Sequence, residues 1–104
     1  MWIYNLTAQV DLEIVEEWKG WLTGFVADKI ESSLFAEKPK LLWVRSQDTE
    51  DGQSFALQLF FESASGLQKF LGHADGIIEK ASQKTFQNKV LYFGSLLEEL
   101  DWKS

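Results

Sequence analysis

The sequence predicts an α+β domain in which a four-stranded antiparallel sheet carries two helices on one face. Three observations support this prediction. Apolar residues alternate with a period of two in the first and third predicted strands, they recur at helical spacing in two longer segments, and these segments follow one another in the order β-α-β-β-α-β. A chain of 104 residues suffices for one domain with a substantial core. We therefore expect a single domain over residues 1–104, with a C-terminal tail from about residue 95.

The first predicted elements are a strand and a helix. Residues 2–10 form the strand, because their side chains alternate between two faces. One face carries Trp2, Tyr4, Leu6, Ala8 and Val10, and the other carries Ile3, Asn5, Thr7 and Gln9. Asp11 is the predicted N-cap of a helix that runs to about Ser33, and the glutamates after Asp11 suit the positive end of the helix dipole.

A hairpin is predicted to follow. Pro39 closes the connection, Leu41–Val44 begin a second strand, and residues 46–52 form a polar loop with an Asp-Gly turn. The third strand alternates clearly. Its apolar face carries Phe55, Leu57, Leu59 and Phe61, and its other face carries Ser54, Ala56, Gln58 and Phe60.

A second helix and a last strand complete the order. Ser63 or Ser65 is the predicted N-cap of the helix, and Lys89–Phe93 form the strand. The apolar stripe of the helix comprises Leu67, Phe70, Leu71, Ala74, Ile77, Ile78 and Ala81. An order of β-α-β-β-α-β is typical of the ferredoxin-like sandwich.

Two helices cover only one face of a four-stranded sheet, and a face that meets water should be polar. The predicted uncovered face is mixed, with Ile3, Asn5 and Phe60, and we expect Leu41, Trp43 and Arg45 to join it. Apolar patches of this kind mark interfaces, and two-fold self-association is the commonest solution. We therefore expect a homodimer, with Ile3, Asn5, Trp43 and Phe60 in its interface.

Composition excludes several function classes. The net charge of −6 and the pI near 4.7 argue against binding to nucleic acid, which requires clustered Lys and Arg. The absence of cysteine excludes disulfides and thiolate chemistry. No apolar run approaches the roughly 20 residues that span a bilayer, and the first residues lack the pattern of a signal peptide. We expect no membrane association and a cytoplasmic location.

The stretch EEWKGWL places two of the five tryptophans three residues apart on the first helix. On a helical wheel Trp18 falls near the middle of the apolar stripe, whereas Trp21 falls at its edge. Trp18 is therefore predicted to belong to the core. Trp21 would lie where a pocket mouth begins, and a pocket between sheet and helices could be lined by Tyr4, Trp21, Phe25 and His73.

Three stretches carry a resemblance to known proteins. They are Ile3–Thr7, the segment Glu17–Leu22 with its two tryptophans, and Lys89–Phe93 with the following Leu96-Leu97-Glu98. They resemble a small bacterial family of unknown function, and the overall plan is similar to the dimeric α/β-barrel superfamily, in which two ferredoxin-like subunits pack sheet against sheet. Some members of that superfamily are cofactor-free or haem-degrading monooxygenases, and the haem-degrading ones use an Asn, a Trp and a His.

Asn5, Trp43 and His73 are the residues to which that resemblance would assign such a role. Strand alternation opposes it, because it directs Asn5, and with it Trp43, away from the helix that carries His73. His73 is the only histidine, so a multi-histidine metal site is excluded. The sequence thus offers no catalytic residues, metal or cofactor. It indicates a non-catalytic homodimeric module that binds a small apolar ligand or a protein, with a cofactor-free monooxygenase or isomerase as the alternative.

Overall fold

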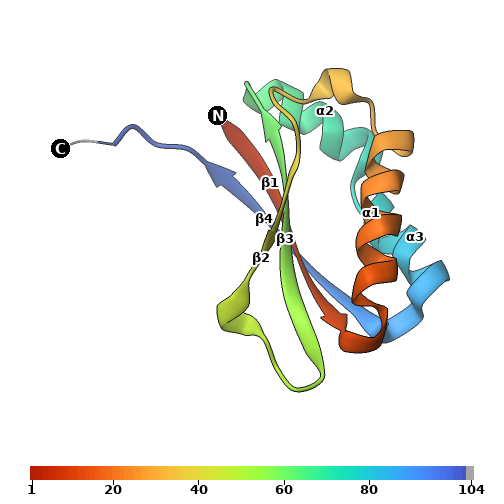
Figure 1. Cartoon of the computed structure of the whole chain (residues 1–104). Helices are drawn as coiled ribbons and strands as arrows, with labels where there is room; N and C mark the ends of the chain where they lie inside the picture. Colours follow the sequence, from red (N-terminus) through yellow and green to blue (C-terminus); the bar gives the residue numbers. More distant parts are fainter. Residues whose placement is uncertain (103–104) are drawn as a thin grey trace.

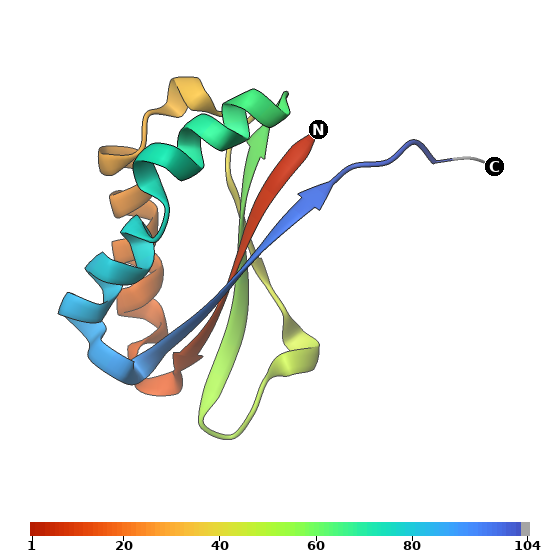
Figure 2. The same ribbon diagram turned by 180° about the vertical axis from the view of Figure 1, so that it is seen from behind.

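The computed structural model describes residues 1–102 and has the predicted α+β order, with one helix divided in two (Figure 1). The strands are β1 (Trp2–Asp11), β2 (Lys40–Trp43), β3 (Gly52–Phe61) and β4 (Val90–Glu98). The helices are α1 (Val15–Lys29), α2 (Ala64–Ala74) and α3 (Ile77–Phe86). The sheet order is β2-β3-β1-β4, with every neighbouring pair antiparallel. The helices lie on one face of the sheet (Figures 1 and 2), as in a ferredoxin-like fold.

The central pair of strands confirms the predicted alternation. β1 and β3 pair in register from Trp2 opposite Phe61 to Asp11 opposite Gly52. Cross-strand partners share a face, so Tyr4 and Leu6 lie beside Leu59 and Leu57 on the helix side. The side chains on that side of both strands are buried, apart from a partly exposed Trp2 and a partly exposed Gln53 at the strand ends. This row of buried residues is the floor of the hydrophobic core.

The first helix begins as predicted and ends earlier than predicted. The Asp11 carboxylate accepts a hydrogen bond from the Glu13 backbone N–H at 3.2 Å, and caps the 3₁₀ turn Leu12–Ile14 that leads into α1. Helix α1 ends at Lys29 rather than near Ser33, because Ile30 adopts extended backbone angles and turns its side chain into the core. The residues that follow, Ser32–Leu34, form a separate 3₁₀ turn.

The second predicted helix is divided at Asp75 and Gly76. Ser63 caps α2, since its Oγ accepts a hydrogen bond from the Gly66 N–H at 3.1 Å. Gly76 then takes a left-handed conformation with φ of 73°, which ends the helical path and is favourable only for glycine. The change of direction lets α3 bury Ile78, Ser82 and Phe86. Of these three, only Ile78 belonged to the predicted stripe.

The expected orientation of the second strand is wrong. In the β2–β3 pairing Leu41 lies opposite Leu57 and Trp43 lies opposite Phe55, so both point to the helix side. The Trp43 and Phe55 ring centroids are 6.1 Å apart. Arg45 stacks its guanidinium 3.8 Å from the Trp43 ring and belongs to a 3₁₀ turn, not to the strand. The pairing register directs Lys40 and Leu42 to the uncovered face instead.

The last strand extends well past its predicted end. β4 runs to Glu98 and pairs with β1 along its whole length, so residues 95–98 belong to the sheet rather than to a tail. The Glu99 N–H donates one further hydrogen bond to the Met1 carbonyl at 2.9 Å. Beyond it the chain extends away from the helices (Figures 1 and 2).

A chain of three polar side chains joins the helices to the sheet. The Trp18 Nε1–H donates to the Tyr92 hydroxyl at 3.0 Å, and the Tyr92 hydroxyl donates to Ser82 Oγ at 2.6 Å. Trp18 is 1% exposed and Ser82 is equally buried. Burial raises the pKa of the Tyr92 hydroxyl, and its hydrogen bonds with Ser82 and Trp18 partly oppose this rise. These bonds satisfy the polar atoms that α1, α3 and β4 bury against one another.

Trp18 and Trp21 are expected to differ in their contribution to stability. Trp18→Ala leaves a large cavity and removes one of the two hydrogen bonds of the Tyr92 hydroxyl, and should lower the free energy of unfolding by about 3 to 5 kcal/mol. Trp21 is only partly buried, with its ring centroid 5.1 Å from that of Phe25 and 5.5 Å from that of Phe86. Trp21→Ala should cost about 1 to 2 kcal/mol. Urea denaturation followed by far-UV circular dichroism measures both values, and equal losses would contradict this assignment.

Candidate functional site

The face of the sheet opposite the helices is the first candidate site. We call it the open face, because α1, α2 and α3 all lie on the other side, and only the 3₁₀ turn Arg45–Gln47 projects on this side (Figures 1 and 2). Strand pairing assigns the following residues to it: Ile3, Asn5, Thr7, Gln9, Asp11, Lys40, Leu42, Ser54, Ala56, Gln58, Phe60, Leu91, Phe93, Ser95 and Leu97. Lys40 and Asp11, the latter at the end of β1, are the only charged residues of this set, in a chain of which 25% is charged. A surface selected only for contact with water would carry more charges.

The polar residues at the centre of the open face bond to one another. Gln58 Nε2 donates to Asn5 Oδ1 at 3.3 Å, and Asn5 Nδ2 donates to Thr7 Oγ1 at 3.2 Å. Further along the same strands Ser54 Oγ donates to Gln9 Oε1. Because these groups already have partners within the sheet, water could be removed from them at a lower cost than from unpaired amides.

Apolar side chains lie at the two edges of the open face. On β4 Leu91 is 64% exposed, Phe93 is 70% exposed and Leu97 is 40% exposed, and on β2 Leu42 is 45% exposed. Phe60, by contrast, is buried within the single chain, with the Lys40 ammonium 5.3 Å from the centroid of its ring. The apolar surface that is still available therefore belongs mainly to β4.

Three of the four predicted interface residues lie on the open face. Ile3, Asn5 and Phe60 are there, whereas Trp43 points to the helix side and donates its Nε1–H to Asp48 Oδ1 at 2.9 Å. The sequence prediction missed Leu42, Leu91, Phe93 and Leu97. The alternation of Leu91 and Phe93 with Val90 and Tyr92 was the signal that could have placed two of them.

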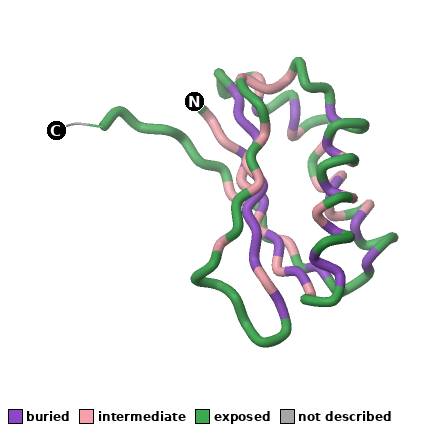
Figure 3. The backbone as a smooth tube through the Cα atoms, viewed as in Figure 1, coloured by how far each residue is buried: buried purple, intermediate pink, exposed green. Residues whose placement is uncertain are grey.

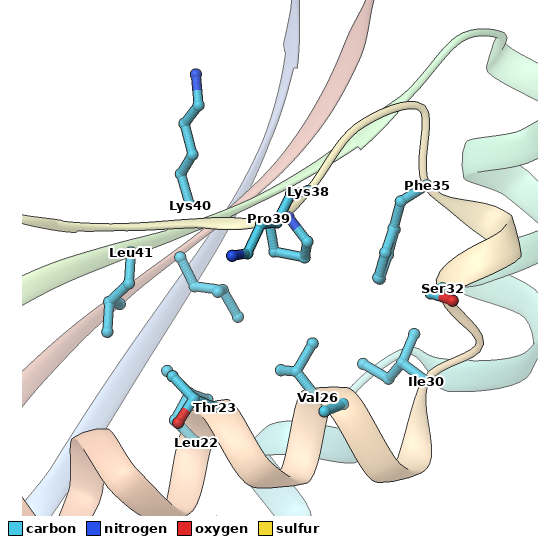
Figure 4. Close-up of a pocket in the computed structure, with 12 residues that line it drawn as sticks. Leu22, Thr23, Val26, Ile30, Ser32, Phe35, Lys38, Pro39, Lys40 and Leu41 are labelled. Carbon is cyan, nitrogen blue, oxygen red and sulfur yellow. The ribbon is translucent and has the colours of Figure 1, made fainter.

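The second candidate site is an apolar pocket between α1 and β2. Its volume is about 290 Å³. Figure 4 shows its walls, which are formed chiefly by Leu22, Val26, Ile30, Phe35, Pro39, Leu41 and Leu57. Lys38 and Lys40 are also among the residues that border it. Lys40 points away from the space and lies 3.7 Å from the Glu37 carboxylate, whereas Lys38 makes no ion pair with any residue from 1 to 102. The pocket can therefore receive an apolar group and place an anion beside Lys38.

The residues predicted to line a pocket lie elsewhere. Tyr4 is in the core, with its ring centroid 5.5 Å from that of Phe70. Trp21 and Phe25 stack on each other and border a shallow surface depression on α1. His73 is exposed in the last turn of α2. None of the cavities described in residues 1–102 has Tyr4 or His73 in its wall.

The residues that the haem-degrading resemblance would assign are not brought together. Asn5 lies on the open face, and His73 lies on a helix on the other side of the sheet. Trp43 lies on the helix side, which corrects its expected placement beside Asn5. In the described chain, no three His, Asp or Glu side chains gather where they could hold a metal ion. Within the same residues no helix is long and apolar enough to cross a bilayer.

Comparison with known families matches residues 1–100 to a domain of unknown function, DUF4286. The chain belongs to the DUF4286 family. Residues 1–100 of this DUF4286 domain contain every strand and helix described above, including the whole of β4. A comparison with curated proteins finds no match. Membership agrees with the predicted resemblance to a family of unknown function.

The Tyr4 hydroxyl lies in a tight environment next to β4. A Cβ atom at Gly94 would lie 3.0 Å from the Tyr4 hydroxyl oxygen, so a larger residue there would require the Tyr4 side chain to shift. Burial raises the pKa of Tyr4 to about 12, with smaller contributions in the same direction from the carboxylates of Glu79 and Asp75. The folded domain therefore disfavours the ionised tyrosinate.

Stability should depend on Tyr4 ionisation at alkaline pH. The unfolded chain ionises Tyr4 near the ordinary tyrosine pKa of 10.0, and the folded chain does so only near a pKa of about 12. Below pH 10 the Tyr4 hydroxyl is neutral in both the folded and the unfolded state, so its ionisation does not affect the free energy of unfolding. As pH rises from 10 to 12, the unfolded state is favoured progressively. Urea midpoints should fall more steeply across this range for the wild type than for Tyr4→Phe, and parallel curves would contradict the raised pKa.

Proposed function

We propose that this DUF4286 domain is a non-catalytic homodimeric module, in which two copies pack open face against open face. The observation that carries the proposal is the exposed apolar set Leu42, Leu91, Phe93 and Leu97 on a face with only two charged residues. Transfer of a Leu or Phe side chain from water into an interface contributes about 1.5 to 3 kcal/mol when burial is complete. Four such side chains per copy are a sufficient driving force for association.

The size of the face also supports this proposal. Three strands of nine or ten residues and the four-residue β2, spaced about 4.8 Å apart, give a footprint of roughly 500 Å². This value does not count the relief of the side chains, and a stable complex buries about 800 Å² per partner. The two values are close enough for sheet packing to sustain a dimer.

Electrostatics favour the same face over the others. The chain carries a net charge of −6, so two copies repel each other through most of their surfaces. The open face has one acidic residue, Asp11 at the end of β1, and its single cation, Lys40, lies on an edge strand next to Glu37. The Lys40 ammonium can remain in the polar rim that surrounds most protein interfaces.

The pocket between α1 and β2 gives this module a binding site. Its walls are apolar and its volume of about 290 Å³ is near the lower limit of known ligand sites. It therefore suits a small apolar group, presented either by a small molecule or by a protein side chain. None of the residues in its wall forms a pair of nucleophile and base.

Phe93→Glu should convert the dimer to a monomer. The substitution puts a carboxylate into a desolvated interface, in both copies at once. Phe93 is 70% exposed in the single chain, so the fold itself should be unaffected. Multi-angle light scattering at tens of micromolar measures the mass of the wild type, of Phe93→Glu and of Lys84→Glu, a control on an exposed residue of α3. A monomeric wild type, or a dimeric Phe93→Glu, would refute the proposed interface.

A further inference from the structure

Residues 99–102, here called the C-terminal arm, expose two large apolar side chains. Leu100 is 77% exposed and Trp102 is 93% exposed, the latter in a domain that partly or fully buries three of its other tryptophans. Figure 3 shows the arm as an exposed segment that leaves the sheet on the side away from the helices. Exposed apolar residues on an extended segment are typical of a segment that binds a partner.

The arm cannot fill the pocket of its own chain. The arm continues from β4 and the pocket borders β2, at opposite edges of the sheet. Three strand spacings of about 4.8 Å separate these edges by roughly 14 Å. Four extended residues span roughly 13 Å, and the arm is directed away from the helical layer in which α1 forms the pocket wall. Any occupant of this kind must come from another copy.

The geometry of a face-to-face dimer brings the two edges together. If the two-fold axis runs parallel to the strands, it reverses the strand order of the second sheet relative to the first. Each β4 then lies opposite the partner's β2, because these strands occupy opposite edges of the order β2-β3-β1-β4. The arm of one copy would therefore start about 10 Å across the interface from the partner's β2, the strand that borders the pocket.

Arm and pocket are also complementary in chemistry. The arm alternates acidic and apolar residues as Glu99, Leu100, Asp101 and Trp102. The pocket offers apolar walls with two lysines at its border, and Lys38 has no ion-pair partner within residues 1–102. An apolar side chain in the pocket would match its apolar walls, and a carboxylate near Lys38 would pair with its charge.

We propose that the C-terminal arm of each copy inserts an apolar side chain, Leu100 or Trp102, into the α1–β2 pocket of the second copy, with Asp101 next to Lys38. This inference rests on the proposed homodimer and names the group that its pocket binds. This reciprocal insertion, here called the exchange, links the two protomers at both edges of the interface. Trp102→Ala should weaken the dimer by about 30-fold, as expected for an aromatic anchor in an apolar pocket.

Cysteine cross-linking tests the exchange directly, because the chain contains no cysteine of its own. One preparation carries Asp101→Cys and a second carries Lys38→Cys. The two are mixed, oxidised with copper phenanthroline and analysed on non-reducing gels. A mixture of Asp101→Cys with Lys84→Cys, which places the second thiol on an exposed residue of α3, gives the level of chance collision. We expect the first mixture to form the mixed disulfide at least 10-fold faster than the control.

The possible outcomes separate the exchange from the dimer. A dimer by light scattering together with selective cross-linking supports both proposals. A dimer whose two mixtures cross-link at the same rate overturns the exchange and leaves the sheet interface intact. A monomer overturns both. Equal binding of 1-anilinonaphthalene-8-sulfonate by the full chain and by a chain that ends at Glu99 would also overturn the exchange, since it would show that the pocket is free in both.

Discussion

The in-register pairing of β1 with β3 is the constraint on which the rest of the structure depends. Side chains alternate between faces along a strand, so a slip of one residue would exchange the two faces completely. Tyr4 and Leu6 would then leave the core, and Asn5 and Thr7 would enter it without their present partners. The observed register puts the uninterrupted apolar row under the helices and the bonded polar row on the open face. The core and the candidate interface are therefore fixed by the same set of hydrogen bonds.

The helices are in turn fixed to this sheet by a few specific contacts. Trp18 fills the space above the sheet with a ring centroid 5.4 Å from that of Phe55, and its Nε1–H bonds to Tyr92 on β4. Tyr92 bonds onward to Ser82 on α3, so three elements that are far apart in sequence share one buried polar chain. Each of these buried polar groups needs its hydrogen-bond partner in one fixed geometry. The helical layer is thus attached to one face of the sheet, and the open face remains uncovered.

The sequence predicted the elements whose apolar residues recur with a regular period. The prediction failed for segments that have no such period. The alternation of β1 and β3 and the stripe through Leu67, Phe70 and Ile78 identified the core correctly. β2 has only four paired residues and three of them are apolar, so its faces were set by its pairing with β3 and Trp43 was misplaced. The break at Gly76 depends on a left-handed backbone angle that leaves no trace in the apolar stripe. The α1–β2 pocket is bordered by the irregular segment between those elements, for which the sequence carried no pattern.

The two edges of the sheet provide a last physical reason for an arm that crosses to a second copy. Packing of open faces removes apolar surface from water, but it leaves the backbone groups of β2 and β4 unpaired at the edges. Such edges invite unwanted pairing with other chains, and proteins protect them with short strands, charges or covering segments. β2 is short and carries Lys40, whereas β4 is long and exposes Leu91 and Phe93. An arm that leaves β4 and lies along the partner's β2 would cover one edge with the continuation of the other, so the same segment that fills the pocket would also limit further association.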